Sequence, residues 1–175
     1  MRRARPKTVC ETERLRLRHA TAEDAPFVLA MMNDPSFLRF IGDRGVRTVD
    51  DARAYIAEKF TASYAEHGFG MYVTVLKETG AAVGSCGLAR RDGLDDVDIG
   101  FAFLSAYRDR GYAHEAARAV MAHARDDIGL SRVVAITDPD NARSAHLLEK
   151  LGLAFERMIR LPDDDTDLRL YVRAL

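Results

Sequence analysis

The sequence predicts one α/β domain built on a curved, mixed, mostly antiparallel sheet of six to seven strands with helices on both faces. Two amphipathic segments come early, a meander of apolar runs lies in the middle, and a strand–helix–strand–helix unit comes near the end. This order favours a single sheet covered on both sides. A length of 175 residues, 47% of them apolar, suits one domain with its own core.

The N-terminal segment is predicted to hold a tail and then a first strand. Residues 1–10 are basic and no apolar segment follows them, so we expect a flexible tail, with the domain over residues 11–175. Leu15 and Leu17 alternate with charged residues, as they would in a strand with one solvated face.

The remaining elements follow from hydrophobic spacing and turn residues. Strands are predicted at 71–76, 82–88, 97–104, 133–136, 154–159 and 168–172. Helices are predicted from Thr21 to the Asn33-Asp34-Pro35 stop, from Thr48 to Gly68, from 113 to 128 and from 141 to 151. The helix that begins at 113 has the strongest apolar periodicity, with small residues at its start.

Composition excludes several classes of protein. The chain has 26 Lys and Arg residues against 27 Asp and Glu residues, and this net charge of −1 gives no field for nucleic acid or anionic membranes. We expect no membrane helix, because such a helix needs about 18 apolar residues in a row. Cys10 and Cys86 have neither disulfide nor zinc-site spacing, so we expect no metal and a reducing, cytoplasmic location.

The turn between the strand at 97–104 and the helix at 113 is the most informative segment. It reads Arg108-Asp109-Arg110-Gly111-Tyr112-Ala113. The first-turn amides of a helix are unpaired and carry about half a positive charge, so they bind phosphate groups. Gly111 allows close approach of the backbone. No Lys-Ser/Thr pair follows it, and no G-x-G-x-x-G occurs, so other phosphate-binding motifs do not fit.

Arg108-x-x-Gly111-x-Ala113 resembles the acetyl-CoA signature Q/R-x-x-G-x-G/A of the GNAT superfamily. Three further segments are similar to the branch that contains ribosomal-protein N-terminal acetyltransferases: Thr12-Glu13-Arg14-Leu15-Arg16-Leu17-Arg18, Val83-Gly84-Ser85-Cys86-Gly87-Leu88, and Asn141-x-x-Ser144-x-x-Leu147-Leu148-Glu149-Lys150-Leu151-Gly152. The resemblance covers residues 11 to 173. It implies the GNAT fold, in which the fourth strand (97–104) splays from the fifth (133–136), with acetyl-CoA as co-substrate.

The resemblance also implies how acetyl-CoA would be held. The backbone of Phe101, Ala102 and Phe103 would pair with the pantetheine arm as an added strand does. The other implied cofactor-binding residues are Arg108, Asp109, Arg110, Gly111, Tyr112, Ala113 and Asn141. The acceptor is expected among the first two helices and the turn between the last two strands.

Two residues are candidates for proton transfer. Asp98 stands two residues before Gly100, where the family often has Glu, and we expect it to act as general base through water. The alternative is a solvated carboxylate in an acidic run. Many relatives have a proton-donating Tyr seven residues after the Asn of the last motif, but this chain has Leu148 there. Ser144 is the nearest hydroxyl, and its alternative role is structural, in the first turn of a helix.

The predicted reaction is acetyl transfer to a primary amine, in the first place the α-amine of a protein or peptide. Deprotonating an α-amine at pH 7 costs about 1 to 1.4 kcal/mol, against about 4.6 kcal/mol for lysine. Two alternatives stay open: an acetyltransferase for a small amine (antibiotic, polyamine or amino acid), and a catalytically silent acyl-CoA sensor, which the missing tyrosine favours. The acidic turn 163–165 is expected to be solvated, and C-terminal edge strands leave room for a homodimer.

Overall fold

An eight-stranded mixed sheet forms the centre of the molecule, a computed structural model that describes residues 5–175. The strands are β1 (Thr8–Glu11), β2 (Leu15–Arg18), β3 (Met71–Leu76), β4 (Ala82–Ala89), β5 (Asp98–Phe103), β6 (Arg132–Thr137), β7 (Ala154–Ile159) and β8 (Leu168–Ala174). Their order across the sheet is β1-β2-β3-β4-β5-β6-β8-β7, and only the β5–β6 pair is parallel. The predicted α/β class is confirmed, whereas the predicted six to seven strands are eight.

The strand that the sequence analysis missed is β1. It pairs antiparallel with β2 and places Glu11 opposite Arg16. It is only 4 residues long and directly follows basic residues, so no alternating pattern distinguished it from a tail. Of the predicted tail over residues 1–10, residues 1–4 lie outside the described residues, and Thr8–Cys10 belong to the sheet.

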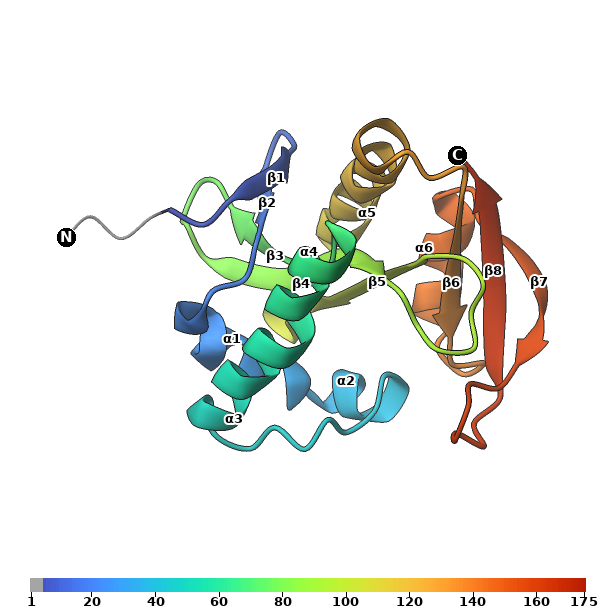
Figure 1. Cartoon of the computed structure of the whole chain (residues 1–175), viewed down its shortest axis with the longest axis horizontal. Coiled ribbons are helices and arrows are strands. Elements are labelled where there is room, and N and C mark those ends of the chain that lie inside the picture. Colours follow the sequence, from blue (N-terminus) through green and yellow to red (C-terminus); the bar gives the residue numbers. More distant parts are fainter. Residues whose placement is uncertain (1–4) are drawn as a thin grey trace.

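Helices cover both faces of the sheet (Figure 1). They are α1 (Ala25–Met32), α2 (Pro35–Phe40), α3 (Val49–Tyr55), α4 (Ala62–His67), α5 (Tyr112–His123) and α6 (Ala142–Lys150). Short 3-10 turns lie at η1 (Ala22–Asp24) and η3 (Ser105–Tyr107), and π-helical turns at η2 (Ile56–Thr61) and η4 (Ala124–Ile128). One buried cluster joins α1–α4 to the sheet, and another joins α5 and α6 to it. The sheet therefore forms the middle layer of three.

Helix α2 begins where the sequence analysis expected a stop. The side chain of Asp34 accepts a hydrogen bond from the amide of Ser36 at 3.0 Å, and Pro35 occupies the first helical position. An acidic N-cap followed by proline is a common helix start, since the fixed φ of proline suits the first turn. The Asn33-Asp34-Pro35 signal thus ends α1 and begins α2 at once.

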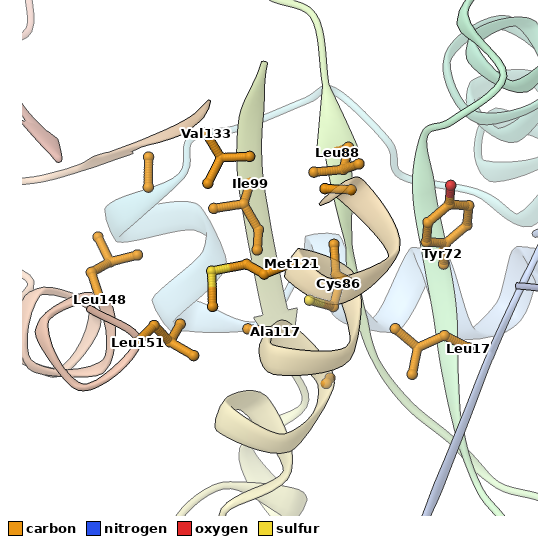
Figure 2. Close-up of a cluster of buried hydrophobic side chains, with 14 of the residues drawn as sticks. Leu17, Tyr72, Cys86, Leu88, Ile99, Ala117, Met121, Val133, Leu148 and Leu151 are labelled. Atoms are coloured by element: carbon orange, nitrogen blue, oxygen red, sulfur yellow. The ribbon is translucent and has the colours of Figure 1, made fainter. Parts of the chain in front are cut away.

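The core between α5 and the sheet holds the helix against the strand that leads into it. Figure 2 shows part of this cluster, in which the labelled residues are Leu17, Tyr72, Cys86, Leu88, Ile99, Ala117, Met121, Val133, Leu148 and Leu151. Cys86 is fully buried there, as expected for an apolar strand residue. Full burial of an aliphatic side chain such as Leu17 or Val133 contributes about 1.5–3 kcal/mol to the free energy of folding. The position of the α5 N-terminus is therefore determined by its packing.

Candidate active site

The strands β5 and β6 separate almost as soon as they meet. Asp98 and Val134 are the one register pair between them, with a hydrogen bond of 3.0 Å from the Val134 amide to the Val97 carbonyl. The even-numbered residues of β5 pair with β4, since the Leu104 amide bonds to the Val83 carbonyl. By alternation, the backbone groups of Phe101 and Phe103 point towards β6, into the gap. The predicted splay is present.

Alternation also separates the three residues that were predicted to pair with the cofactor. Ala102 lies opposite Ser85 of β4, so its backbone groups are directed into the ladder and away from the gap. The carbonyl of Phe103 accepts hydrogen bonds from Arg108, at 3.2 Å from Nε and 2.9 Å from the terminal nitrogen. The amide and carbonyl of Phe101 and the amide of Phe103 are thus the groups that the geometry leaves for a ligand in the gap.

The N-terminus of α5 lies at the end of β5 and presents unpaired amides. None of the amides of residues 109–114 donates a hydrogen bond to any part of the chain between residues 5 and 175. Asp109 and Gly111 have positive φ angles of 61° and 79°, conformations that Asp tolerates and Gly adopts freely. A row of free amides beside the positive end of a 12-residue helix is suited to an anion such as a diphosphate.

Arg14, in the β1–β2 turn, contacts the segment that carries these free amides. Its guanidinium donates to the carbonyl of Arg110 at 2.9 Å and to Glu115 at 2.7 Å, and it stacks over the Tyr112 ring at 4.5 Å from the ring centre. The sequence analysis quoted Arg14 only as part of a family segment. Its role could not be derived from local pattern, because Arg110 lies 96 residues away.

Arg108, a predicted cofactor-binding residue, directs its side chain elsewhere. Besides the Phe103 carbonyl, its terminal nitrogen contacts Asp34 at 2.9 Å and Ser36 Oγ at 2.5 Å. The Arg108 amide is also engaged, with the carbonyl of Ser105 at 3.3 Å. Arg108 therefore holds the loop in place, and the free amides begin one residue later, at Asp109.

Asn141 and Ser144 approach the same loop from the first turn of α6. An ion pair of 3.4 Å between Arg143 and Asp109 joins the two segments. The side-chain oxygen of Asn141 caps the helix by accepting from the Ser144 amide at 3.2 Å. Leu148 is buried in the core (Figure 2) and offers no hydroxyl. Of the predicted residues in α6, Asn141 is thus mainly a cap, and Ser144 keeps a half-buried hydroxyl.

Asp98 is buried, so the alternative of a solvated carboxylate is wrong. By alternation along β5 its side chain is on the face opposite Val97 and Ile99, which pack with α5, and the residue is only 1% exposed. Oδ2 accepts from Arg91 Nε at 2.5 Å, while Oδ1 is buried without a hydrogen-bond partner among the described residues. Burial raises the pKa of Asp98 to about 6, and Arg91 opposes that rise only in part. A buried carboxylate with one free oxygen can accept a proton near neutral pH.

Three loops lie close together on the side of Asp98. A Cβ on Gly93, in the β4–β5 loop, would lie 2.5 Å from Pro162, so this loop touches the β7–β8 loop. Hydrogen bonds from Thr166 lower the pKa of the exposed Asp164, and the positive charge of Arg44, in the α2–α3 loop, adds a smaller effect in the same direction. The acidic turn is exposed, as expected. The β4–β5, β7–β8 and α2–α3 loops therefore lie near one another.

Residues 5–175 contain neither a helix that could span a membrane nor a cluster of metal-ligating side chains. No helix in that range is both long and apolar enough to cross a membrane. Within the same stretch, no three His, Cys, Asp or Glu side chains come together as a set of metal ligands.

Comparison with known proteins agrees with the geometry. The family model of the acetyltransferase (GNAT) domain matches residues 14–154. The chain is 28% identical over 145 residues to YnaD of Bacillus subtilis, an uncharacterized N-acetyltransferase, covering 83% of this chain and 82% of that one. An acetyltransferase structure from Agrobacterium tumefaciens is 25% identical, with a TM-score of 0.79 over 95% of this chain and 94% of that one.

A more distant structure shares the fold. RimL, a ribosomal L7/L12 α-N-protein acetyltransferase solved with coenzyme A, has a TM-score of 0.82 at 16% identity, over 97% of this chain and 98% of its own. Since the family model spans most of the chain and the splayed sheet has the matching architecture, the chain belongs to the GNAT acetyltransferases and is an acyltransferase.

Proposed function

We propose that this enzyme transfers the acetyl group of acetyl-CoA directly to a primary amine, in the first place the N-terminal α-amine of a protein or peptide. The observation that carries the proposal is the row of free amides at 109–114 beside the point where β5 and β6 separate. The amides fit a diphosphate, and the backbone groups of Phe101 and Phe103 fit the amides of a pantetheine arm. Acetyl-CoA supplies the thioester that is consumed.

In the proposed reaction, the amine nitrogen bonds to the acetyl carbon, the carbon–sulfur bond breaks, and the amine proton passes to Asp98. At about 3.3 Å per residue, Asp98 lies about 10 Å along β5 from Phe101, so the proton passes through water. Free amides facing the gap stabilise a carbonyl oxygen that gains negative charge, an effect of about 2.7–4 kcal/mol per donor in other enzymes.

The raised pKa of Asp98 favours an α-amine over lysine as the acceptor. A base whose pKa is about 6 lies about 2 pH units below an α-amine, whose pKa is about 7.7–8.0, but more than 4 below lysine. Proton transfer from the amine to the base becomes less favourable as this difference in pKa increases. The proposed acceptor is therefore the amine whose pKa is closer to that of Asp98.

We propose Ser144 as the proton donor to the leaving thiolate, since Leu148 has no hydroxyl. Replacement of Ser144 by alanine is expected to lower kcat less than about tenfold, because a thiol whose pKa is near 8.5 leaves readily without an acid. The measurement is the rate of thiol release, with Ser131→Ala, an exposed serine outside the site, as control. A loss above a hundredfold would show that protonation of the thiolate is obligatory.

Coenzyme A is expected to stabilise the folded enzyme. At a hundred times its dissociation constant, a ligand that binds only the folded state adds about 2.7 kcal/mol. For a chain of this size, such a gain raises Tm by about 5–10 °C. Thermal unfolding with and without coenzyme A measures it, with adenosine as a control that lacks the diphosphate. No shift at millimolar coenzyme A would contradict the proposed site.

The acceptor class is tested by measuring thiol release with a panel of amines. Peptides with a free N-terminus should be acetylated, whereas the same peptides with a blocked N-terminus and an internal lysine should react far more slowly. Turnover of small amines alone would favour an antibiotic, polyamine or amino acid as acceptor. Coenzyme A binding without turnover of any amine would favour the silent sensor. The buried Leu148, which has no hydroxyl, is the observation that supports this alternative.

A further inference from the structure

Asp34 connects two parts of the molecule that are far apart in sequence. Its carboxylate caps α2 through Ser36, and it also accepts hydrogen bonds from the amide of Ser105 at 3.3 Å, from the hydroxyl of Ser105 and from Arg108. Its side chain is only 9% exposed. Although partial burial acts to raise it, the hydrogen bonds from Ser105, Arg108 and Ser36 keep the pKa of Asp34 far below its usual range. Asp34 is therefore a charged junction at neutral pH.

Arg108 makes the other half of this junction. One terminal nitrogen reaches Asp34, Ser36 and the Phe103 carbonyl, so a single guanidinium links α2, the end of β5 and the β5–α5 loop. Asp109, the first residue with a free amide, follows Arg108 directly in the chain. A ligand that restrains the free amides therefore also restrains a loop that is hydrogen-bonded to α2.

Helix α2 has little stability of its own. It is 6 residues long, and Phe37 is its one buried residue. Helices this short are not stable without tertiary contacts, so the order of α2 depends on the Asp34 junction and on Phe37. Because α2 lies between the two early helical segments among which the acceptor is expected, its order matters for the amine substrate.

We propose that Asp34 and Arg108 are positioning residues that couple the binding of coenzyme A at residues 109–114 to the ordering of α2. The coupling rests on the proposed function, since it needs coenzyme A at the start of α5. An anion on the free amides restrains the loop, the Asp34–Arg108 pair carries the restraint to α2, and local opening of α2 becomes rarer. By thermodynamic linkage, an acceptor that orders α2 would in turn favour coenzyme A.

Hydrogen–deuterium exchange with and without coenzyme A tests the coupling. Two groups of amides are followed in the full chain: the free amides of 109–114, and an α2 group, made of the amide of Leu38 and those of Ile41 and Gly42 just after the helix, which bond to the carbonyls of Asp34 and Phe37. In the wild type we expect coenzyme A to slow both groups, the α2 group by at least about fivefold, the lower end of typical coupling between sites.

Two variants cut the junction from opposite ends. Asp34→Asn keeps a helix-capping side chain but removes the charge, and Arg108→Gln removes the guanidinium. In both, coenzyme A should still slow the amides of 109–114 but should no longer slow those of α2. Asp50→Asn is the matched control, since Asp50 is an exposed helix-start aspartate paired with Arg53 at 2.6 Å. This control should respond as the wild type does, and unchanged slow exchange in α5 verifies folding of every variant.

Each outcome is decisive. A response of α2 that persists in both variants, or a wild type in which 109–114 respond and α2 does not, overturns the coupling and leaves the proposed function intact. A wild type in which neither group responds to saturating coenzyme A overturns the proposed function itself, and the coupling with it.

Discussion

Replacement of Gly111 by valine is expected to weaken the binding of coenzyme A about a hundredfold. A Cβ at Gly111 would lie 3.4 Å from the guanidinium of Arg14, and the φ angle of 79° is unfavourable for a β-branched residue. The contact with Arg14 is near ordinary van der Waals distance, so the strain is in the backbone, and its relief rotates the neighbouring amides away from the anion. Hydrogen bonds to a charged group contribute about 1.5–3 kcal/mol each, so misalignment of one or two of them gives this loss.

Gly129 provides a matched control for the backbone strain. Its φ angle is 81°, it ends η4 at the opposite end of the same long helical segment, and an added Cβ there has no atom within 4 Å among the residues described. Gly129→Val should therefore lower the free energy of unfolding by about 1–2 kcal/mol, as Gly111→Val should. It should leave the dissociation constant of coenzyme A unchanged. Calorimetric titration with coenzyme A and denaturant unfolding measure the two effects. Equal affinities for the two variants would refute the assignment of the amides.

The parts of the site that depend on local rules were predictable from sequence. The positive end of α5 and the need for glycine at 111 follow from neighbouring residues, because a helix start and a tight turn are determined within a few positions. Strand β3 (Met71–Leu76) and strand β7 (Ala154–Ile159) also agree with the predicted bounds. Alternation along the strand also separates Asp98 from the face of Val97 and Ile99, because successive side chains of a strand point to opposite faces.

The parts that depend on distant contacts were not predictable. Asp34 was taken as part of a helix stop, yet its partner Arg108 lies 74 residues away. The buried carboxylate of Asp98 is paired with Arg91 of the β4–β5 loop, and a Cβ on Gly93 of that loop would lie 2.5 Å from Pro162 of the β7–β8 loop. Charged residues in an acidic run are usually solvated, and only the tertiary arrangement reverses this for Asp98. The same holds for Arg108, whose basic character suggested an anion ligand but whose guanidinium is used within the protein.

Replacement of Asp98 by asparagine is expected to lower kcat about a hundredfold or more with a peptide α-amine, since a positioned general base contributes about 10²–10⁴. The wild-type kcat/KM should rise as the pH passes through about 6, where Asp98 loses its proton. Asparagine cannot accept a proton, so this rise should vanish in the variant, and only the rise caused by the amine substrate should remain. Thiol release measured between pH 5 and 9 checks both expectations.

Stability should change in the opposite sense over the same pH range. The pKa of Asp98 is raised in the folded state, so its protonated form stabilises the fold at low pH, and this contribution is lost as the pH rises through about 6. Other carboxylates also titrate, so the informative quantity is the difference in free energy of unfolding between wild type and Asp98→Asn. The variant should gain relative to the wild type from pH 4 to pH 7. This is the pattern expected when a buried charge is retained for activity at the expense of stability.

Asp96→Asn separates the base from the general charge of the acidic run. Asp96 is two residues away, half-buried, and paired with Arg132 at 3.0 Å, so its replacement makes the same change of charge near the site. This variant should keep both the rise in kcat/KM near pH 6 and the wild-type pH dependence of stability. If Asp98→Asn instead retains kcat within threefold while its stability gains as expected, Asp98 is a buried carboxylate without a role in proton transfer. The amine would then reach the thioester already deprotonated. Deprotonation at pH 7 costs an α-amine about 1–1.4 kcal/mol and a lysine about 4.6 kcal/mol. The preference for an α-amine would therefore remain even if the enzyme had no general base.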